Sequence, residues 1–472
     1  MTDSASRAGA VPDGKSAGSP LRRVPRPAQT GAALVAAVCL TAAFLFGRVE
    51  LVLVAAPLLL AVLGDRVRRP RDGSAVTMRA HAVAAADGSE PAPGVAGAGE
   101  PTRDDGATAR VAVAVSAAAA PGSHPDAIQL RITPADRTPV DTVLTARAAT
   151  QLRVGVAVGH SGPQRVVLVE GRAIGADASW TGDPDVPGAA ATVVRVVRPA
   201  ALPIRSLPLP ARLQGLTGQH VSSRPGDGGE FRDVDRYRAG DRLRRIDWKA
   251  TARRAQRPGE LYVRRTTATS DAAVQLVLDA RDDLPGEVAD WAAPHPRAGL
   301  RSLDVAREAA VSLATAYAAV ADRVGFDDIA DAARALPPRS GSRHREAVLR
   351  RIETTTARRA VGDRVRVPRL ATGALVYVLS TFLDDQPLRL ALTWRAAGHR
   401  VIAVDVLPPL RAATLTAREQ IALRVVVAER AVRLERLRAA GADLLVWTSP
   451  DRDSALRRLA APRRRATAGR PA

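Results

Sequence analysis

The chain is short of the residues on which much of protein chemistry depends. It has one cysteine, Cys39, among 472 residues, so neither a disulfide nor a cysteine-based metal site can form within one chain. Its seven histidines are scattered and show no ligand spacing such as HxxxH, and Lys15 and Lys249 are its only lysines. We also find no GxxxxGK[ST], GxSxG or HExxH pattern. We therefore expect that the protein is not an enzyme.

Positive charge, by contrast, is abundant: the formal net charge is +21, and nearly all of the cationic residues are arginine. Such a charge can favour nucleic acid or anionic lipid. The arginines are spread over the whole chain, however, and no zinc-finger, RNA-binding or helix-turn-helix pattern is present. We expect no nucleic-acid partner, and a nucleic-acid binder is the weaker alternative.

A long apolar run at 31–64 predicts a two-helix membrane hairpin, because Arg48 and Glu50 break it near the middle. One helix of this length would measure about 51 Å, well beyond the roughly 30 Å of a bilayer core. Arginines flank both sides of the run: Arg22, Arg23 and Arg26 before it, and Arg66, Arg68, Arg69 and Arg71 after it. The positive-inside rule then predicts a two-pass protein of the cell membrane, in contact with lipid, with both termini and the soluble domains in the cytoplasm. Residues 1–30 are expected to form a disordered basic tail.

The region 72–200 carries short runs in which apolar and polar residues alternate, separated by Gly, Pro and Asp. These runs are 110–116, 127–134, 150–159, 164–173 and 191–199. Alternation of this kind predicts strands, and several strands at such spacing predict a small β-sandwich-like domain with a structural or interaction role. Residues 201–228 are expected to be a linker.

From 271 the pattern becomes α/β. Apolar strands are expected at 272–280, 374–385, 399–408 and 442–448, and helices at 303–326, 340–355, 386–398 and 416–441. Continuous apolar strands joined by helices predict a mostly parallel sheet covered on both faces. The fold class is thus multidomain, with an α/β domain at 271–460 and a basic tail at 461–472. Sites in such sheets lie beyond the carboxyl ends of the strands.

This pattern resembles the von Willebrand factor A fold, whose first loop often reads Asp-x-Ser-x-Ser and holds Mg²⁺ through hard oxygen ligands. Here the loop has Asp279, Arg281 at the first Ser position and Asp283 at the second. Two alternatives stay open. Asp279, Asp283 and Asp384 could bind Mg²⁺ in a metal-dependent enzyme or a metal-mediated binding protein. Alternatively, Asp279 pairs with Arg281 or caps the next turn, and no cofactor is needed.

The segment 229–270 collects aromatic residues among charges, although aromatics form only 3% of the chain. Gly240 and Asp241 suit a turn, Asp247 can accept from an arginine, and Trp248 can bury its ring. The segment is either a structural clasp or a site for an anion or peptide. Its candidate binding residues are Glu230, Phe231, Tyr237, Gly240, Asp241, Arg245, Asp247, Trp248 and Arg253.

The same segment resembles the hallmark of the domain-of-unknown-function 58 family. The matching positions are Glu230, Phe231, Tyr237, Gly240, Asp241, Arg245, Ile246, Trp248, Thr251, Ala252 and Arg253. The resemblance implies a von Willebrand factor A-like domain that partners a MoxR-type AAA+ ATPase, often beside a transglutaminase-like membrane protein. We therefore expect a membrane-anchored, non-enzymatic adaptor or scaffold in envelope assembly or protein maturation.

Overall fold

The computed structural model describes residues 21–23, 27–67, 76–83, 109–119, 127–135, 138–145, 150–174, 180–182, 189–211, 213, 218–293, 299–358, 362–364 and 366–461. Most of the expected basic tail 1–30 and nearly all of the tail 461–472 lie outside these residues. The chain divides into two compact units. The first comprises Met1–Gly159 and Gln164–Arg195, and the second comprises His160–Pro163 and Val196–Ala472.

Two helices form a hairpin near the start of the first unit: α1 (Pro27–Phe46) and α2 (Glu50–Val67), joined at Gly47, whose φ is +61°. The expected break at 47–50 is therefore present, but the expected membrane spans are wrong. Within the described residues, no helix has the length and apolar content that crossing a membrane requires.

The physical reason is that polar residues occupy the helix ends. Helix α1 starts with Pro-Ala-Gln-Thr, and α2 starts at Glu50 and ends with Gly-Asp-Arg-Val. The mainly apolar parts, 31–46 and 51–64, are about 24 and 21 Å long, short of the roughly 30 Å of a bilayer core. The predicted transmembrane hairpin and two-pass membrane location are corrected accordingly.

The other described residues of the first unit are mainly strands, which form two sheets. One has the order β1-β8-β7-β4-β5 with β9 also paired to β7, and the other has the order β2-β3-β6. The strands are β1 (Leu21–Arg23), β2 (Val76–Val83), β3 (Ala109–Ala119), β4 (Ala127–Pro134), β5 (Val140–Thr145), β6 (Thr150–Val158), β7 (Gly162–Ile174), β8 (Trp180–Gly182) and β9 (Ala189–Val197). The sulfur of Met78 in β2 lies directly against Gly171 of β7, where it leaves no room for a Cβ. The two sheets therefore face one another, as the alternation predicts.

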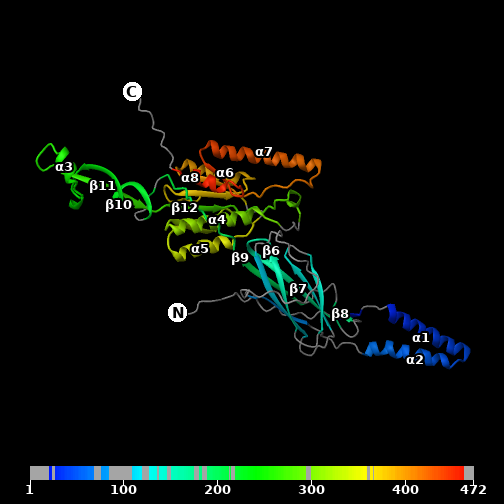
Figure 1. Ribbon diagram of the computed structural model, residues 1–472. Helices are drawn as coiled ribbons and strands as arrows, with labels where there is room; N and C mark the ends of the chain where they lie inside the picture. The colour runs from blue at the N-terminus through cyan, green and yellow to red at the C-terminus, as the bar shows by residue number, and fades with distance from the viewer. Residues whose placement is uncertain are drawn as a thin grey trace, which may run out of the picture. The chain divides into compact units, whose positions relative to one another are not determined.

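The second unit contains a six-stranded sheet in the order β14-β13-β12-β15-β16-β17 (Figure 1). Its strands are β12 (Ala273–Leu278), β13 (Arg323–Asp328), β14 (Asp331–Arg339), β15 (Leu375–Ser380), β16 (Arg400–Asp405) and β17 (Asp443–Val446). All neighbouring pairs are parallel except β13 with β14, which is antiparallel. The expected mostly parallel α/β sheet is present, with one antiparallel strand at its edge.

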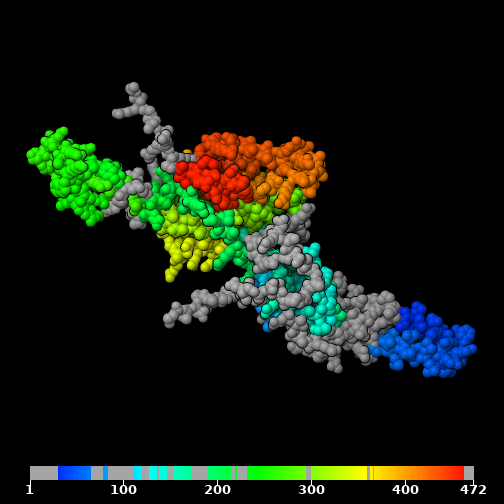
Figure 2. Space-filling view, viewed as in Figure 1, coloured from blue at the N-terminus to red at the C-terminus, as the bar shows by residue number. Residues whose placement is uncertain are grey.

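Helices cover both faces of this sheet. They are α4 (Ser302–Ala319), α5 (Ser342–Glu353), α6 (Asp385–Ala396), α7 (Ala417–Ala439) and α8 (Arg452–Ala460). Side chains of α4, α5 and α8 share one buried apolar cluster with Val274, Leu276 and Leu278 of β12, whereas α6 and α7 share another with Val277. The alternation along β12 thus sends successive side chains to opposite faces. In Figure 2 the side chains of α7 and α8, orange and red, form one continuous surface.

Part of the segment expected to be a linker packs on the α4 face of this sheet. Leu202, Ile204, Leu207 and Leu209 contact the apolar cluster there. The Tyr317 hydroxyl donates to the Pro208 carbonyl at 2.5 Å and lies 2.8 Å from the Tyr377 hydroxyl. These hydrogen bonds connect the extended segment to α4 and β15 and so fix it on the domain.

Between this extended segment and β12 the chain forms a two-stranded ribbon. Its strands, β10 (His220–Arg236) and β11 (Tyr262–Ser270), pair antiparallel with several irregularities in register. The connection between them holds the short helical segments η2 (Leu243–Arg245) and α3 (Trp248–Arg254) at the end of the ribbon (Figure 1). The sequence hallmark therefore forms a discrete element of its own.

Candidate functional site

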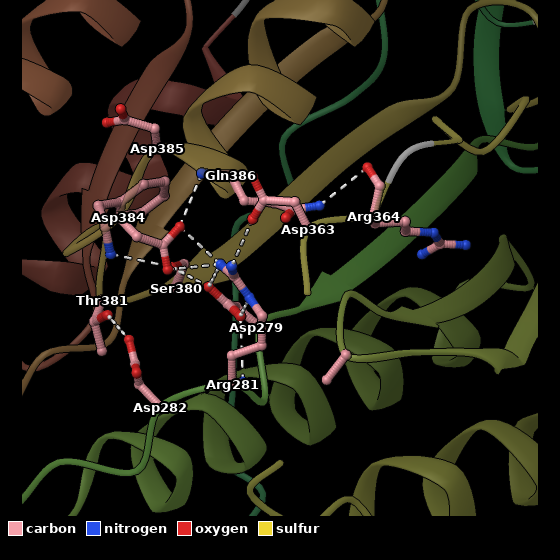
Figure 3. A network of polar contacts seen from close by, with 12 residues as sticks. Asp279, Arg281, Asp282, Asp363, Arg364, Ser380, Thr381, Asp384, Asp385 and Gln386 are labelled. Atoms are coloured by element: carbon pink, nitrogen blue, oxygen red, sulfur yellow. Dashed lines mark hydrogen bonds and ion pairs between the residues drawn. The ribbon is translucent and has the colours of Figure 1, made fainter. Parts of the chain in front are cut away.

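The carboxyl ends of β12 and β15 bring together residues that are about a hundred positions apart. Asp279 follows β12, Ser380 ends β15, and Asp384 caps the amino end of α6 by accepting from the Gln386 amide at 2.8 Å. Because β12 and β15 are neighbouring parallel strands, their ends meet at one edge of the sheet. Figure 3 shows the guanidinium of Arg281 lying among these side chains.

Arg281 binds two of these carboxylates at once. Its Nε donates to Asp279 Oδ1 at 2.9 Å and its Nη2 to Asp279 Oδ2 at 3.0 Å, a bidentate pair. The same Nη2 donates to Asp384 Oδ1 at 2.9 Å. The side chains of Arg281 and Asp279 are only 10% and 2% exposed. Burial lowers the pKa of Arg281, but the bonds and charges of Asp279 and Asp384 outweigh it and hold the pKa above its usual value.

Ser380 ties the two strand ends together. Its hydroxyl donates to Asp279 Oδ2 at 2.8 Å and accepts from the Phe382 amide at 3.0 Å. Phe382 is fully buried and has φ of +55°, a conformation that is strained for a bulky side chain. The Ser380 bonds hold this turn in place, so the geometry of the loop after β15 depends on Asp279.

Asp282 lies beside this network without sharing its arginine. It accepts from the Thr381 hydroxyl at 3.3 Å. Burial raises its pKa above the ordinary value, and the nearby negative charges of Asp279 and Asp384 raise it further. The raised pKa of Asp282 is thus a consequence first of burial and then of its closeness to two other carboxylates.

The three residues predicted as possible Mg²⁺ ligands are not brought together as a set. Asp279 and Asp384 share Arg281, whereas Asp283 lies 3.3 Å from the Arg301 guanidinium and accepts from the Leu303 amide at 3.4 Å. Among the residues that the structure describes, no group of three His, Cys, Asp or Glu side chains is placed to hold a metal ion. The positive charge between Asp279 and Asp384 is supplied by the chain itself.

Other strands of the sheet carry the same kind of pair at this edge. Arg364 donates to Asp327 of β13 at 2.9 Å, and Arg430 of α7 pairs with Asp405 of β16. Arg430 also donates to the Thr381 carbonyl at 2.7 Å. Sequence reasoning missed both arginines, since the chain is rich in arginine and only the fold selects the partner.

The hallmark residues form a hydrogen-bonded turn at the end of the ribbon. Asp247 caps α3 by accepting from the Ala250 amide at 2.9 Å, and Asp241 accepts from the Arg238 amide at 2.9 Å. Gly240 has φ of +103°, which the turn requires and glycine permits. These contacts agree with the structural-clasp interpretation in its backbone part.

The arginine that secures this turn is one that sequence reasoning did not select. Arg265 of β11 donates to Asp235 Oδ2 at 2.6 Å and to the Arg236 carbonyl at 3.3 Å, and lies 3.6 Å from Asp241. The signal that could have found it is the register of the ribbon, which places Arg265 opposite Asp233. Arg253, one of the candidate binding residues, lies exposed in the last turn of α3.

Three large apolar side chains of this segment are exposed, and the expected burial of Trp248 is wrong. Trp248 is 68% exposed, Leu243 is 66% exposed, and Phe231 is 53% exposed with the Arg264 guanidinium 5.1 Å above its ring. Tyr237 is half-buried and its amide donates to the Leu261 carbonyl at 2.8 Å. The side chain of Glu230 lies outside the described residues. The segment is therefore held together by internal hydrogen bonds and leaves these three apolar side chains exposed among charged residues.

Comparison with known proteins gives one family and no function. Residues 233–440 match the family model described as "Protein of unknown function DUF58". Uncharacterized proteins of Mycobacterium bovis and of two strains of Mycobacterium tuberculosis are each 30% identical over 220 residues, which is 44% of this chain and 65% of theirs. The match thus spans just under two thirds of the length of these relatives. No solved structure gives a significant match.

Proposed function

The chain belongs to the DUF58 family through residues 233–440, and we propose that it is a non-enzymatic adaptor that binds a MoxR-type AAA+ ATPase. The ATPase, and a role in envelope assembly or protein maturation, follow from what the family resemblance implies. The structural support comes from the edge of the α/β sheet where Arg281 lies.

The observation that carries the proposal is that both carboxylate oxygens of Asp279 already accept hydrogen bonds. One of its oxygens accepts from Arg281 Nε, and the other accepts from Arg281 Nη2 and the Ser380 hydroxyl. A general base must be reachable by the proton that it removes. A buried carboxylate whose two oxygens are already bound suits the fixing of loops better than the transfer of protons.

Around this fixed centre lie exposed charges that a partner can contact. Asp363 pairs with both Arg281, at 3.7 Å, and Arg389, while Asp385 accepts from Arg433 at 2.6 Å. The carboxylates of Asp363 and Asp385 are more than half exposed. Charges at the rim of a surface set the rate and specificity of association more than its strength. The edge therefore suits regulated, reversible binding of another protein.

The proposal is tested with the purified chain and the purified MoxR-type ATPase of the same organism. Size-exclusion chromatography with and without ATP should give a complex, and Asp279→Ala should weaken it by loosening both loops. The matched control is Asp271→Ala. Asp271 accepts from Arg323 at 2.8 Å just before the amino end of β12, so this variant also breaks an Asp–Arg pair but at the opposite edge of the sheet. If no complex forms in either nucleotide state, or if Asp279→Ala binds as the wild type does, the proposed role of this edge is contradicted.

A further inference from the structure

The end of the β10–β11 ribbon, residues 236–257, exposes two large apolar side chains that are close in the sequence. We call this segment the ribbon tip. Leu243 lies in η2 and Trp248 begins α3, only five positions later, and both are largely exposed. A single exposed apolar residue is ordinary, but Trp is costly to leave in water and is scarce here, with five in the whole chain. The exposure of both side chains therefore suggests that the ribbon tip is a binding surface.

The backbone beneath these side chains is held firmly. The Asp247 amide donates to the Tyr262 carbonyl at 2.8 Å, and the Tyr262 amide donates to the Thr251 hydroxyl at 2.9 Å. Asp247 then caps α3 directly before Trp248. A side chain presented on a fixed backbone loses less conformational freedom on binding than one on a loose loop. The ribbon tip is thus prepared to hold Trp248 in one place.

The ribbon tip is also strongly cationic. It contains nine basic residues and two acids, a net charge of +7. The basic residues are Arg236, Arg238, Arg242, Arg244, Arg245, Lys249, Arg253, Arg254 and Arg257. The two acids, Asp241 and Asp247, each accept from a backbone amide of the tip itself. Arg236 and Arg238 also pair with Glu260 and Asp235 just outside the tip. The basic residues still outnumber the acids, so the surface of the tip is positive and complements an acidic surface.

The composition favours a protein partner over nucleic acid or lipid. Trp and Arg are the residues that most often carry the energy of protein–protein contacts. Leu243 has no ring to stack on a base, which distinguishes the tip from a stacking platform for single strands. Helix α3 has seven residues and Trp248 as its one large apolar side chain, too little for an apolar face that enters a membrane.

We propose that the ribbon tip is the surface that docks on an acidic face of the partner ATPase, with Trp248 and Leu243 entering an apolar recess and the arginines pairing with surrounding carboxylates. This inference rests on the proposed function and adds the contact surface and the chemistry of the partner. The strand-end edge at Arg281 and the ribbon tip are separate elements, so their contributions can be separated by mutation.

The experiment measures the Kd between the full chain and the purified ATPase for the wild type, Trp248→Ala, Leu243→Ser and the charge reversal Arg253→Glu with Arg254→Glu. We expect Trp248→Ala and the charge reversal each to weaken binding at least tenfold, and added salt to weaken the wild type. The matched control is Val143→Ser, which changes an exposed apolar residue of β5 outside both the tip and the strand-end edge and should bind as the wild type does. Because the altered side chains are exposed, thermal unfolding should be unchanged.

Each other outcome overturns the inference in a distinguishable way. If the tip variants bind the ATPase as the wild type does, the tip is not part of the interface, and the proposed adaptor function is unaffected. Absence of wild-type binding to the ATPase removes both proposals together. A loss in the tip variants of binding to a DNA duplex or to anionic vesicles, with ATPase binding retained, assigns the tip to another class of partner.

Discussion

Arg281 links acidic side chains that come from separate parts of the chain, and its charge takes the place that a cation would have between Asp279 and Asp384. A buried pair is weak evidence for added stability, but removing one partner leaves the other charge buried without compensation. The energetic role of Arg281 is therefore best seen by removing it.

We predict that Arg281→Ser lowers the free energy of unfolding by about 3 kcal/mol, because Asp279 and Asp384 then lie close together with no cation between them. Millimolar Mg²⁺ should restore part of this loss, since two carboxylates and the introduced hydroxyl are hard oxygen ligands. Urea unfolding with and without Mg²⁺ measures both effects.

The control for this variant is Arg301→Ser, which removes the partner of Asp283 and should not respond to Mg²⁺. An Arg281→Ser protein as stable as the wild type, or one that Mg²⁺ leaves unchanged while stabilising the wild type, would contradict the view that Arg281 is an internal cation.

Asp328, at the end of β13, makes the stability of the fold depend on pH. Burial raises its pKa to about 6, against the opposing effects of its bond from the Ala330 amide and the charge of Arg334. Since an unfolded Asp titrates near 3.9, the folded protein binds more protons than the unfolded chain between about pH 4 and pH 6. The contribution of Asp328 therefore makes the protein less stable as the pH rises through this window.

Asp328→Asn keeps an oxygen for the Ala330 bond and removes the buried charge. Relative to the wild type, we predict that this variant gains on the order of 2 kcal/mol between pH 4 and pH 7.5. Urea unfolding of both proteins at the two pH values measures the difference. An equal difference at both pH values would show that Asp328 does not titrate in this range.

At the same scale, the sequence predicts that Asp279, Arg281 and Asp384 belong to one edge of a sheet, because acids follow apolar strands. It does not predict that Asp283 turns to Arg301, or that Arg265, Arg364 and Arg430 are the partners of other acids. Those choices depend on strand register and helix placement, which residue spacing alone leaves open.

A buried pair of hydroxyls joins α4 and β15 to the extended segment 201–211. Tyr317 of α4 donates to Pro208 in the extended segment, so Tyr377 of β15 is the donor to Tyr317. Both rings are fully buried, and burial raises the pKa of each hydroxyl above its ordinary value. This pair fastens the segment 201–211 to the sheet.

We predict that Tyr317→Phe costs about 2–3 kcal/mol of unfolding free energy, because it leaves both the Pro208 carbonyl and the Tyr377 hydroxyl without their partner. Tyr377→Phe should cost about 1 kcal/mol, since Tyr317 keeps its bond to Pro208. Guanidinium unfolding of the two variants gives the comparison, and equal losses would mean that the Pro208 bond contributes nothing.

Sequence reasoning at the scale of elements found four strands of the α/β sheet and missed two. The expected helix 303–326 ends earlier, at Ala319, and Arg323–Asp328 forms β13. Strand β14 contains Pro337 and Pro338, which are compatible only with the edge position that it occupies. The helical periodicity of α4 runs into the short β13 without a proline break, so the boundary is not visible before folding.

For the molecule as a whole, the chain combines a β-rich unit with an α/β unit that carries the family match. The sequence predicts a change from period-two alternation to apolar strands and amphipathic helices near residue 271. The second compact unit already begins at Val196 and also includes His160–Pro163. The membrane prediction for the helical hairpin was wrong, because it rested on the length of the apolar run. Polar residues at the helix ends leave no described helix able to cross a membrane. Neither unit alone identifies a client, and the central claim concerns what the α/β unit binds.

The most direct measurement of that claim is a calorimetric titration of the MoxR-type ATPase into the full chain, in its wild-type form and as Asp279→Ala and Trp248→Ala. We predict saturable binding by the wild type, weaker binding by each variant, and the larger loss for Trp248→Ala. No heat of binding from the wild type in either nucleotide state would contradict the adaptor function itself.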